Sequence, residues 1–117
     1  MPARIVIVHD DPAFTGPLMT SLGADTVLFI DPLKALKTLE NARTVEFLIC
    51  RLQFEDRQPL GLSLARVVRD VRPDVRVIFT GHPDYRHVAR GLGEFAPEPI
   101  APAYVATIVE WLEAERP

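Results

Sequence analysis

The sequence predicts an α/β domain in which five parallel strands are covered by helices on both faces. Short apolar runs recur along the chain, and the β-branched run at residues 4–8 lacks the alternation of a half-exposed strand. Segments with helical spacing of apolar residues separate these runs. Strands that alternate with helices form right-handed βαβ units around a parallel sheet. We therefore expect residues 1–117 to form one three-layer domain.

The composition is that of an ordinary globular domain and excludes several classes of protein. The chain is 48% hydrophobic and 25% charged, with a formal net charge of −3. Its Lys and Arg residues are scattered, so nothing predicts nucleic-acid binding. The single cysteine, Cys50, excludes an internal disulfide and is expected to be a small buried residue. No signal peptide or membrane-spanning run is evident, so we expect a cytoplasmic protein.

The predicted elements follow from capping signals and periodicity. The strands are expected at residues 4–8, 26–30, 45–51, 75–80 and 94–96. The helices are expected at residues 12–22, 32–42, 60–72, 83–92 and 102–114. Asp11 and Asp31 each precede a proline and are predicted N-caps, and Gly23 is expected to end the first helix. The helix at residues 83–92 is the weakest because its residues are mostly polar.

Apolar spacing predicts which residues of each helix face the sheet. The expected inward positions are Phe14, Leu18 and Leu22, then Leu33, Leu36, Leu39 and Ala42, then Leu64, Val67, Val68 and Val71, and finally Val105, Ile108, Val109 and Leu112. In open parallel sheets, ligands bind beyond the carboxyl ends of the strands. The residues expected there are His9, Asp10, Asp11, Arg51, Thr80, Gly81 and Glu98. We expect a pocket at that edge.

Three stretches together resemble the receiver domain of bacterial response regulators (CheY-like). They are Ile-Val-Ile-Val-His-Asp-Asp-Pro at residues 5–12, Val-Ile-Phe-Thr-Gly at 77–81 and Phe-Ala-Pro-Glu-Pro-Ile at 95–100, and Gly61 also matches the family's usual glycine. The resemblance covers essentially the whole chain. It implies a flavodoxin-like (βα)5 fold with strand order 2-1-3-4-5, and a role in two-component (phosphorelay) signal transduction.

The chemical positions of the family depart from its pattern here. Carried over residue by residue, the acidic pair falls on His9 and Asp10, the phosphoacceptor on Arg51, the hydroxyl on Thr80, the lysine on Glu98 and the switch aromatic on Phe95. An arginine has no nucleophilic oxygen and stays protonated, so it cannot form an acyl phosphate. Its charge would also repel Mg²⁺. The resemblance therefore implies a pseudo-receiver with no catalytic role, cofactor or metal.

The two largest departures are complementary in charge. We expect Arg51 to form an ion pair with Glu98 or with Asp10 that neutralises the pocket without a phosphoryl group, and the sequence leaves open which acid is the partner. Alternatively, Arg51 reaches solvent or binds an anion. His9 could bind a metal with Asp11 and Glu98, or be structural. Asp10 or Asp11 as a substitute phosphoacceptor is a further alternative. Thr80 is expected to hydrogen-bond locally, and His82 and His87 to be exposed.

Tyr104 and Trp111 form a candidate interface on the last helix. They lie seven residues apart on a face distinct from its apolar one. In the family, the face formed by the fourth helix, fifth strand and fifth helix is the usual docking surface. The predicted function is a phosphorylation-independent interaction module whose partner is a histidine kinase, another regulator or a second copy. The alternatives are an active phosphoacceptor with unconventional residues, or a sensor of a small anion or metal.

Overall fold

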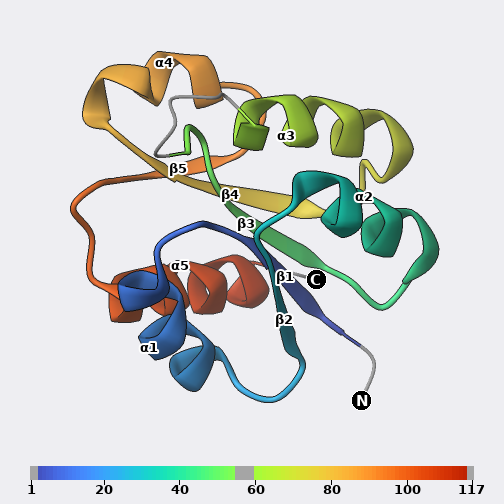
Figure 1. The fold of residues 1–117 in the computed structure, drawn as a ribbon, viewed down its shortest axis with the longest axis horizontal. Helices are drawn as coiled ribbons and strands as arrows, with labels where there is room; N and C mark the ends of the chain where they lie inside the picture. Colours follow the sequence, from blue (N-terminus) through green and yellow to red (C-terminus); the bar gives the residue numbers. More distant parts are fainter. Residues whose placement is uncertain (1–2, 55–59, 116–117) are drawn as a thin grey trace.

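A computed structural model describes residues 3–54 and 60–115, and these form a five-stranded parallel sheet with helices on both faces (Figure 1). The strands are β1 (Ile5–Val8), β2 (Thr26–Phe29), β3 (Phe47–Arg51), β4 (Arg76–Gly81) and β5 (Glu94–Pro97). The helices are α1 (Pro12–Leu22), α2 (Pro32–Asn41), α3 (Leu60–Val71), α4 (Arg86–Ala89) and α5 (Pro102–Ala114), with a 3-10 turn at Pro83–Tyr85 before α4. The strand order is β2-β1-β3-β4-β5, which confirms the predicted fold class.

The two faces of the sheet carry separate apolar cores. Along β1, Ile5 and Ile7 face α1 and α5, whereas Val6 and Val8 face α2 and α3. All four side chains are fully buried, as expected for a central parallel strand. Figure 1 shows α1 with α5 on one side of the sheet and α2 with α3 on the other.

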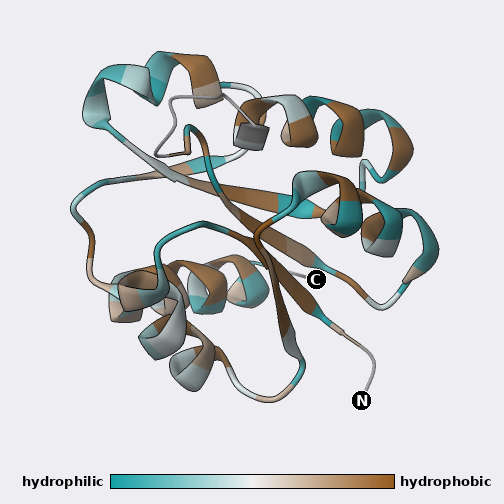
Figure 2. Cartoon of the chain, in the orientation of Figure 1, coloured by the Kyte–Doolittle hydropathy of each residue, from teal (hydrophilic) through white to brown (hydrophobic). Residues whose placement is uncertain are grey.

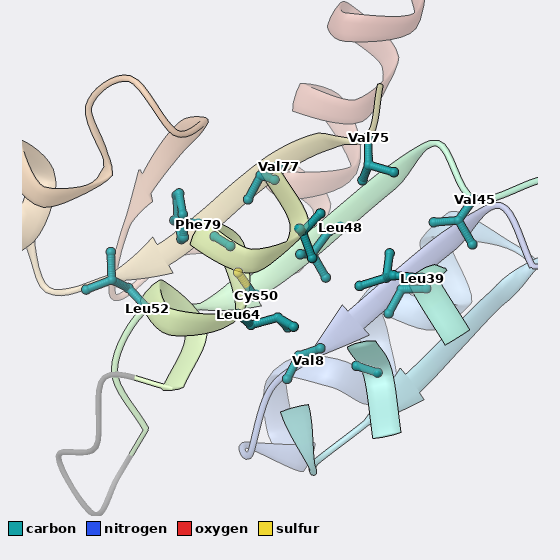
Figure 3. Close-up of a cluster of buried hydrophobic side chains, with 14 of the residues drawn as sticks. Val8, Leu39, Val45, Leu48, Cys50, Leu52, Leu64, Val75, Val77 and Phe79 are labelled. Atoms are coloured by element: carbon teal, nitrogen blue, oxygen red, sulfur yellow. The ribbon is translucent and has the colours of Figure 1, made fainter. Parts of the chain in front are cut away.

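The core under α2 and α3 is continuous across three strands (Figure 3). Leu39 from α2 and Leu64 from α3 pack over Val8, Leu48 and Phe79. Burying each such side chain contributes about 1.5–3 kcal/mol. Cys50 lies in this core, fully buried, and burial raises the pKa of its thiol. In Figure 2 the strands are largely hydrophobic along their length. This packing fixes the carboxyl ends of the strands, where the candidate site lies.

The predicted helix signals are confirmed for α1 and α2. The carboxylate of Asp11 accepts a hydrogen bond from the backbone N–H of Ala13 at 3.0 Å, and Asp31 accepts one from Leu33 at 2.9 Å. Gly23 follows α1 with a φ of 105°, a conformation that glycine adopts without strain. These caps place each helix start directly after a strand, at the edge where functional groups gather.

The sequence placed some apolar side chains on the wrong side of their helices. Leu33 is 76% exposed on α2, and Val67 and Val71 are 42% and 43% exposed on α3. Successive helical residues are rotated by about 100°, so Leu33 points away from the face that buries Ala35. Likewise Val67 lies beside, not on, the stripe formed by Leu64, Ala65 and Val68. Both helices bury narrower faces than predicted.

The fourth helix is shorter than residues 83–92. It consists of the 3-10 turn and a single α-helical turn that ends at Ala89, and Arg90 is already extended. Gly91 then takes a φ of 84°. Residues 55–59, between the strand predicted at 45–51 and the helix predicted at 60–72, lie outside the described residues. Within the described chain, no helix has the length and apolar character needed to cross a bilayer.

Candidate functional site

Four polar side chains meet at the carboxyl edge of the sheet because all four continue the set of strand side chains that points to the same face. His9, Arg51, Thr80 and Glu98 each lie two residues beyond a member of the core that faces α1 and α5. They therefore emerge on the same side of the sheet, at its end. Gly61 allows this edge to close, since a side chain there would meet the backbone oxygen of Arg51 at 1.8 Å. The helix α3 thus starts against the end of β3.

Arg51 is held by two carboxylates. Its Nε and Nη2 donate to the two oxygens of Glu98 at 3.1 and 2.9 Å, which makes a bidentate pair. Its Nη1 donates to Oδ1 of Asp10 at 2.8 Å. The structure thus contains the ion pair expected from the sequence, and Arg51 engages both acids at once. The side chain is only 18% exposed, so it does not reach into solvent.

The two carboxylates keep the Arg51 guanidinium charged. Burial alone would lower the pKa of the Arg51 guanidinium, but its hydrogen bonds to Glu98 and Asp10 raise the pKa above its usual value. Three of its five N–H donors are used by carboxylates of this chain. Two carboxylates already offset its single positive charge, so an external anion would meet an excess of negative charge. The geometry therefore disfavours the anion-binding alternative for Arg51.

His9 is buried, neutral and held in one tautomer. Its Nδ1 accepts the backbone N–H of Asp11 at 3.1 Å, so the ring proton of the neutral form lies on Nε2. The ring stacks on Phe14 with centroids 4.7 Å apart. Burial, and then the positive charge of Arg51, lower the pKa of His9, while Glu98, Asp10 and Asp11 oppose this less strongly. Protonation of Nδ1 would also break the bond to Asp11.

His9 should make the protein less stable in mild acid. Because its pKa is lower in the folded state, the unfolded chain binds the proton first; the stabilising contribution is present above pH about 6.5 and is lost as pH falls toward the folded pKa. The free energy of unfolding should fall by up to about 1.4 kcal/mol per pH unit in that range.

The matched variant is His9→Asn, whose amide oxygen can still accept the Asp11 N–H without titrating. Urea unfolding between pH 7.5 and 5 measures both proteins. Parallel pH profiles for the wild type and His9→Asn would contradict this role of His9.

The residues at this edge do not fit a magnesium ion. Mg²⁺ requires free carboxylate oxygens in octahedral geometry. Here the guanidinium of Arg51 occupies the carboxylates of both Asp10 and Glu98, and its positive charge would repel the ion. Within residues 3–54 and 60–115, no group of three His, Cys, Asp or Glu side chains could hold a metal ion. This also argues against the metal site of His9, Asp11 and Glu98.

Thr80 and Phe95 are close to this site, and Thr80 differs from expectation. Thr80 pairs in register with Arg51 and is fully buried. Its hydroxyl has no hydrogen-bond partner in the part of the chain that the structure describes, so the expected local hydrogen bond is wrong. Nothing in the sequence signals that the hydroxyl stays unpaired. Phe95 is half-buried, and the Arg86 guanidinium lies 5.4 Å from its ring centroid.

Tyr104 and Trp111 form an exposed aromatic pair on α5. Their rings meet edge to face with centroids 6.0 Å apart, and they are 48% and 55% exposed. The opposite face of α5 buries Val105, Ile108 and Leu112, as predicted. His82 and His87 are exposed, also as predicted.

A cleft of about 480 Å³ opens beside the Arg51 pair. It lies between the start of α1 and the segment that joins β5 to α5. Its apolar wall includes Phe14, Pro99 and Ile100, and its polar rim includes Asp11 and Glu98. Sequence reasoning missed this wall. The sequence did contain one indication of the wall: Phe14 and Ile100 each follow the end of a strand, which places both at the same edge of the sheet.

Comparison with known proteins shows which solved structures share this fold. No protein-family model and no curated protein matches the sequence. Among solved structures, a response regulator receiver protein from Sinorhizobium medicae WSM419 superposes with a TM-score of 0.79 at 17% identity, covering 98% of this chain and 97% of that one. A CheY-like receiver domain from Methanospirillum hungatei JF-1 gives 0.76 at 20% identity, covering 97% and 96%. A Thermotoga maritima response regulator gives 0.75 at 14% identity, covering 98% and 100%.

Proposed function

We propose that this chain is a pseudo-receiver, a cytoplasmic interaction module of two-component signalling that acts without phosphorylation and without catalysis. The receiver-type fold of its structural neighbours supports the signalling context. The resemblance of residues 5–12, 77–81 and 95–100 to the receiver family supports the same context. The site chemistry supports independence from phosphorylation. Fold alone would not be enough, because this architecture serves many functions.

The observation that carries the proposal is the pairing of Arg51. A guanidinium stands at the end of β3, where the resemblance puts the phosphoacceptor, and it bridges Asp10 and Glu98. At an effective dielectric constant of about 20 and a separation of about 4 Å, one such attraction is worth about 4 kcal/mol before desolvation is subtracted. The site thus supplies its own counter-charge and holds one arrangement without a phosphoryl group.

Incubation with acetyl phosphate and Mg²⁺ should leave the mass of the protein unchanged. Arg51 offers no oxygen nucleophile, and the carboxylate of Asp10 is engaged by its guanidinium. Intact-protein mass spectrometry after incubation is the measurement, with an active receiver domain as the positive control. Stoichiometric addition of a phosphoryl group would refute the proposal and favour an unconventional phosphoacceptor.

A signalling module without phosphoryl transfer must act through contacts, and we propose Tyr104 and Trp111 as the contact residues. A half-exposed Trp–Tyr pair offers a large apolar area at low entropic cost, and these residue types dominate binding hot spots. The partner would be a histidine kinase, another regulator or a second copy of the chain. In the last case, the dimer would use the face of α4, β5 and α5.

Trp111→Ala should weaken binding to the partner by about tenfold or more. Pull-downs from the lysate of the source cells, and sedimentation of the purified chain for self-association, measure this. Leu33→Ala is the matched control, because Leu33 is exposed and apolar but lies on α2. If Trp111→Ala retains every partner that the wild type binds, α5 is not the interface.

A further inference from the structure

His9 presents an unused hydrogen-bond donor to the cleft beside the Arg51 pair. The side chain is 3% exposed and lines the cleft. Since Nδ1 accepts from Asp11, the proton of the neutral ring is on Nε2. The nearest acceptor recorded for Nε2 is an oxygen of Glu98 at 3.9 Å, which is too far for a hydrogen bond. Among the described residues, Nε2 therefore has no protein partner, and it is open to the cleft.

The carboxylates that line the cleft already accept hydrogen bonds from the protein. Both oxygens of Glu98 accept from Arg51, and Asp11 caps α1 through Ala13. The unused groups are donors, namely Nε2 of His9 and the two N–H groups of Arg51 that the acids leave free, so a ligand that enters the cleft must bring an acceptor. Around this position, the carboxylates of Asp10, Asp11 and Glu98 outnumber the single guanidinium of Arg51. That excess of negative charge disfavours an anionic acceptor.

The rest of the cleft favours an apolar body. Phe14 of α1 and Ile100 of the segment before α5 both line the cleft, as do Pro99 and Pro102. The volume of about 480 Å³ lies in the range of small-molecule sites, which combine apolar walls with few convergent polar groups. A ligand that fits this cleft must combine an apolar body with a hydrogen-bond acceptor.

We propose that this cleft binds a small uncharged molecule with an apolar, ring-sized body and a carbonyl oxygen that accepts the Nε2 proton of His9. The carbonyl replaces solvent at the Nε2 donor, and the body packs against Phe14 and Ile100. The proposal goes beyond the proposed function, because it needs only the paired state of Arg51 and no signalling partner. A ligand here would contact α1 and the β5–α5 segment together.

Four compounds of similar size separate the chemical possibilities. Acetophenone has a neutral carbonyl, ethylbenzene has no acceptor, benzoate is an anion and 1-phenylethylamine is a cation. Titration of ¹⁵N-labelled protein, followed through the amides of Asp11 and Ile100 and the His9 side chain, measures each dissociation constant. Acetophenone should bind with a Kd of about 1–10 mM, as expected for a ligand of so few atoms. Its binding should be at least threefold tighter than that of the other three.

Two variants test the contacts. His9→Asn keeps the bond to the Asp11 N–H but removes the Nε2 donor, so acetophenone should bind no better than ethylbenzene. Ala13→Trp, at an exposed position that lines the cleft, should block all four compounds. Ser21→Trp, on the exposed far end of α1, is the control and should bind like the wild type.

The proposal is overturned if acetophenone causes no saturable shifts, if benzoate or 1-phenylethylamine binds more tightly, or if His9→Asn binds acetophenone unchanged. Thermal melts confirm that the variants are folded, and Ala13→Trp keeps the test valid if His9→Asn does not fold. None of these outcomes bears on the acetyl phosphate experiment. A failure here is therefore distinguishable from a failure of the pseudo-receiver proposal.

Discussion

Arg72→Met should lower the free energy of unfolding by about 3–5 kcal/mol. Arg72 follows α3 and is 1% exposed. Its Nη1 donates to the carbonyls of Leu39 and Ala42 at 2.7 and 3.0 Å, and its Nη2 to that of Val45 at 2.9 Å. Its Nε and Nη2 also donate to Asp74 at 3.0 and 2.9 Å. One guanidinium thus donates hydrogen bonds to the backbone carbonyls at the end of α2 and to one carbonyl just before β3.

Methionine fills a similar volume but takes the Arg72 donors from the carbonyls of Leu39 and Val45, and each such loss in a buried place costs about 1–3 kcal/mol. The carbonyl of Ala42 also loses its bond to Arg72 but still accepts from the backbone N–H of Val45 at 3.2 Å. Urea unfolding with a fixed m-value is the measurement. Arg66→Met is the matched control, since Arg66 is exposed on the same helix and its replacement should change stability by less than about 0.5 kcal/mol. Equal effects of the two substitutions would show that Arg72 does not have this role.

The strands and the central ion pair were predictable because they depend on local signals. Buried parallel strands need continuous apolar runs, and residues 4–8 and 45–50 have them. The placement of Arg51 beside Glu98 followed from strand ends meeting at one edge and from opposite charges at the two positions. The sequence left open whether Glu98 or Asp10 would pair with Arg51. The structure shows both, because a guanidinium has donors on two sides.

The features that could not be predicted depend on packing between distant segments. Arg72 resembles any basic residue near a helix end, a position where arginine is usually solvated. Its burial follows from carbonyls of residues about thirty positions earlier, which no local pattern reveals. The exposure of Val67 and Leu33 has the same origin, since the width of a buried helix face is set by its neighbours. The unpaired hydroxyl of Thr80 likewise leaves no mark in the sequence.

That hydroxyl bears on how much of the phosphoryl chemistry the fold retains. Thr80 lies beside Arg51 in register, buried and without a partner in the described chain. Leaving a hydroxyl unpaired costs about 1–3 kcal/mol, so the position has not been optimised for the present pocket. The resemblance implies that the family uses this hydroxyl to contact a phosphoryl group. Under the proposed function, Thr80 is a position of that site that the chain keeps, whereas Arg51 and Glu98 replace two others.

If the proposed resemblance holds, placing the family's residues at the other three positions should make the chain accept a phosphoryl group. The triple variant His9→Asp, Arg51→Asp, Glu98→Lys is expected to gain one phosphoryl group from acetyl phosphate in the presence of Mg²⁺. The carboxylate oxygen introduced at position 51 attacks phosphorus, the bond to the acetate oxygen breaks, and acetate leaves with its electron pair. Two acids at positions 9 and 10 supply oxygen ligands for the ion, and lysine at position 98 supplies the cation that Glu98 now excludes. Mass spectrometry should show a change from no modification to near-stoichiometric modification.

The control differs only at the acceptor: His9→Asp, Arg51→Asn, Glu98→Lys has the same shape at position 51 but no carboxylate, and should stay unmodified. Hydroxylamine should remove the group from the triple variant, since it cleaves acyl phosphates. If both variants fold, as judged by far-UV circular dichroism, and neither is modified, the lost chemistry does not reside in these three positions. Modification of both variants equally would place it on another side chain. Modification of the aspartate variant alone would show that the residues at positions 9, 51 and 98, and not the surrounding fold, separate this domain from a phosphoacceptor.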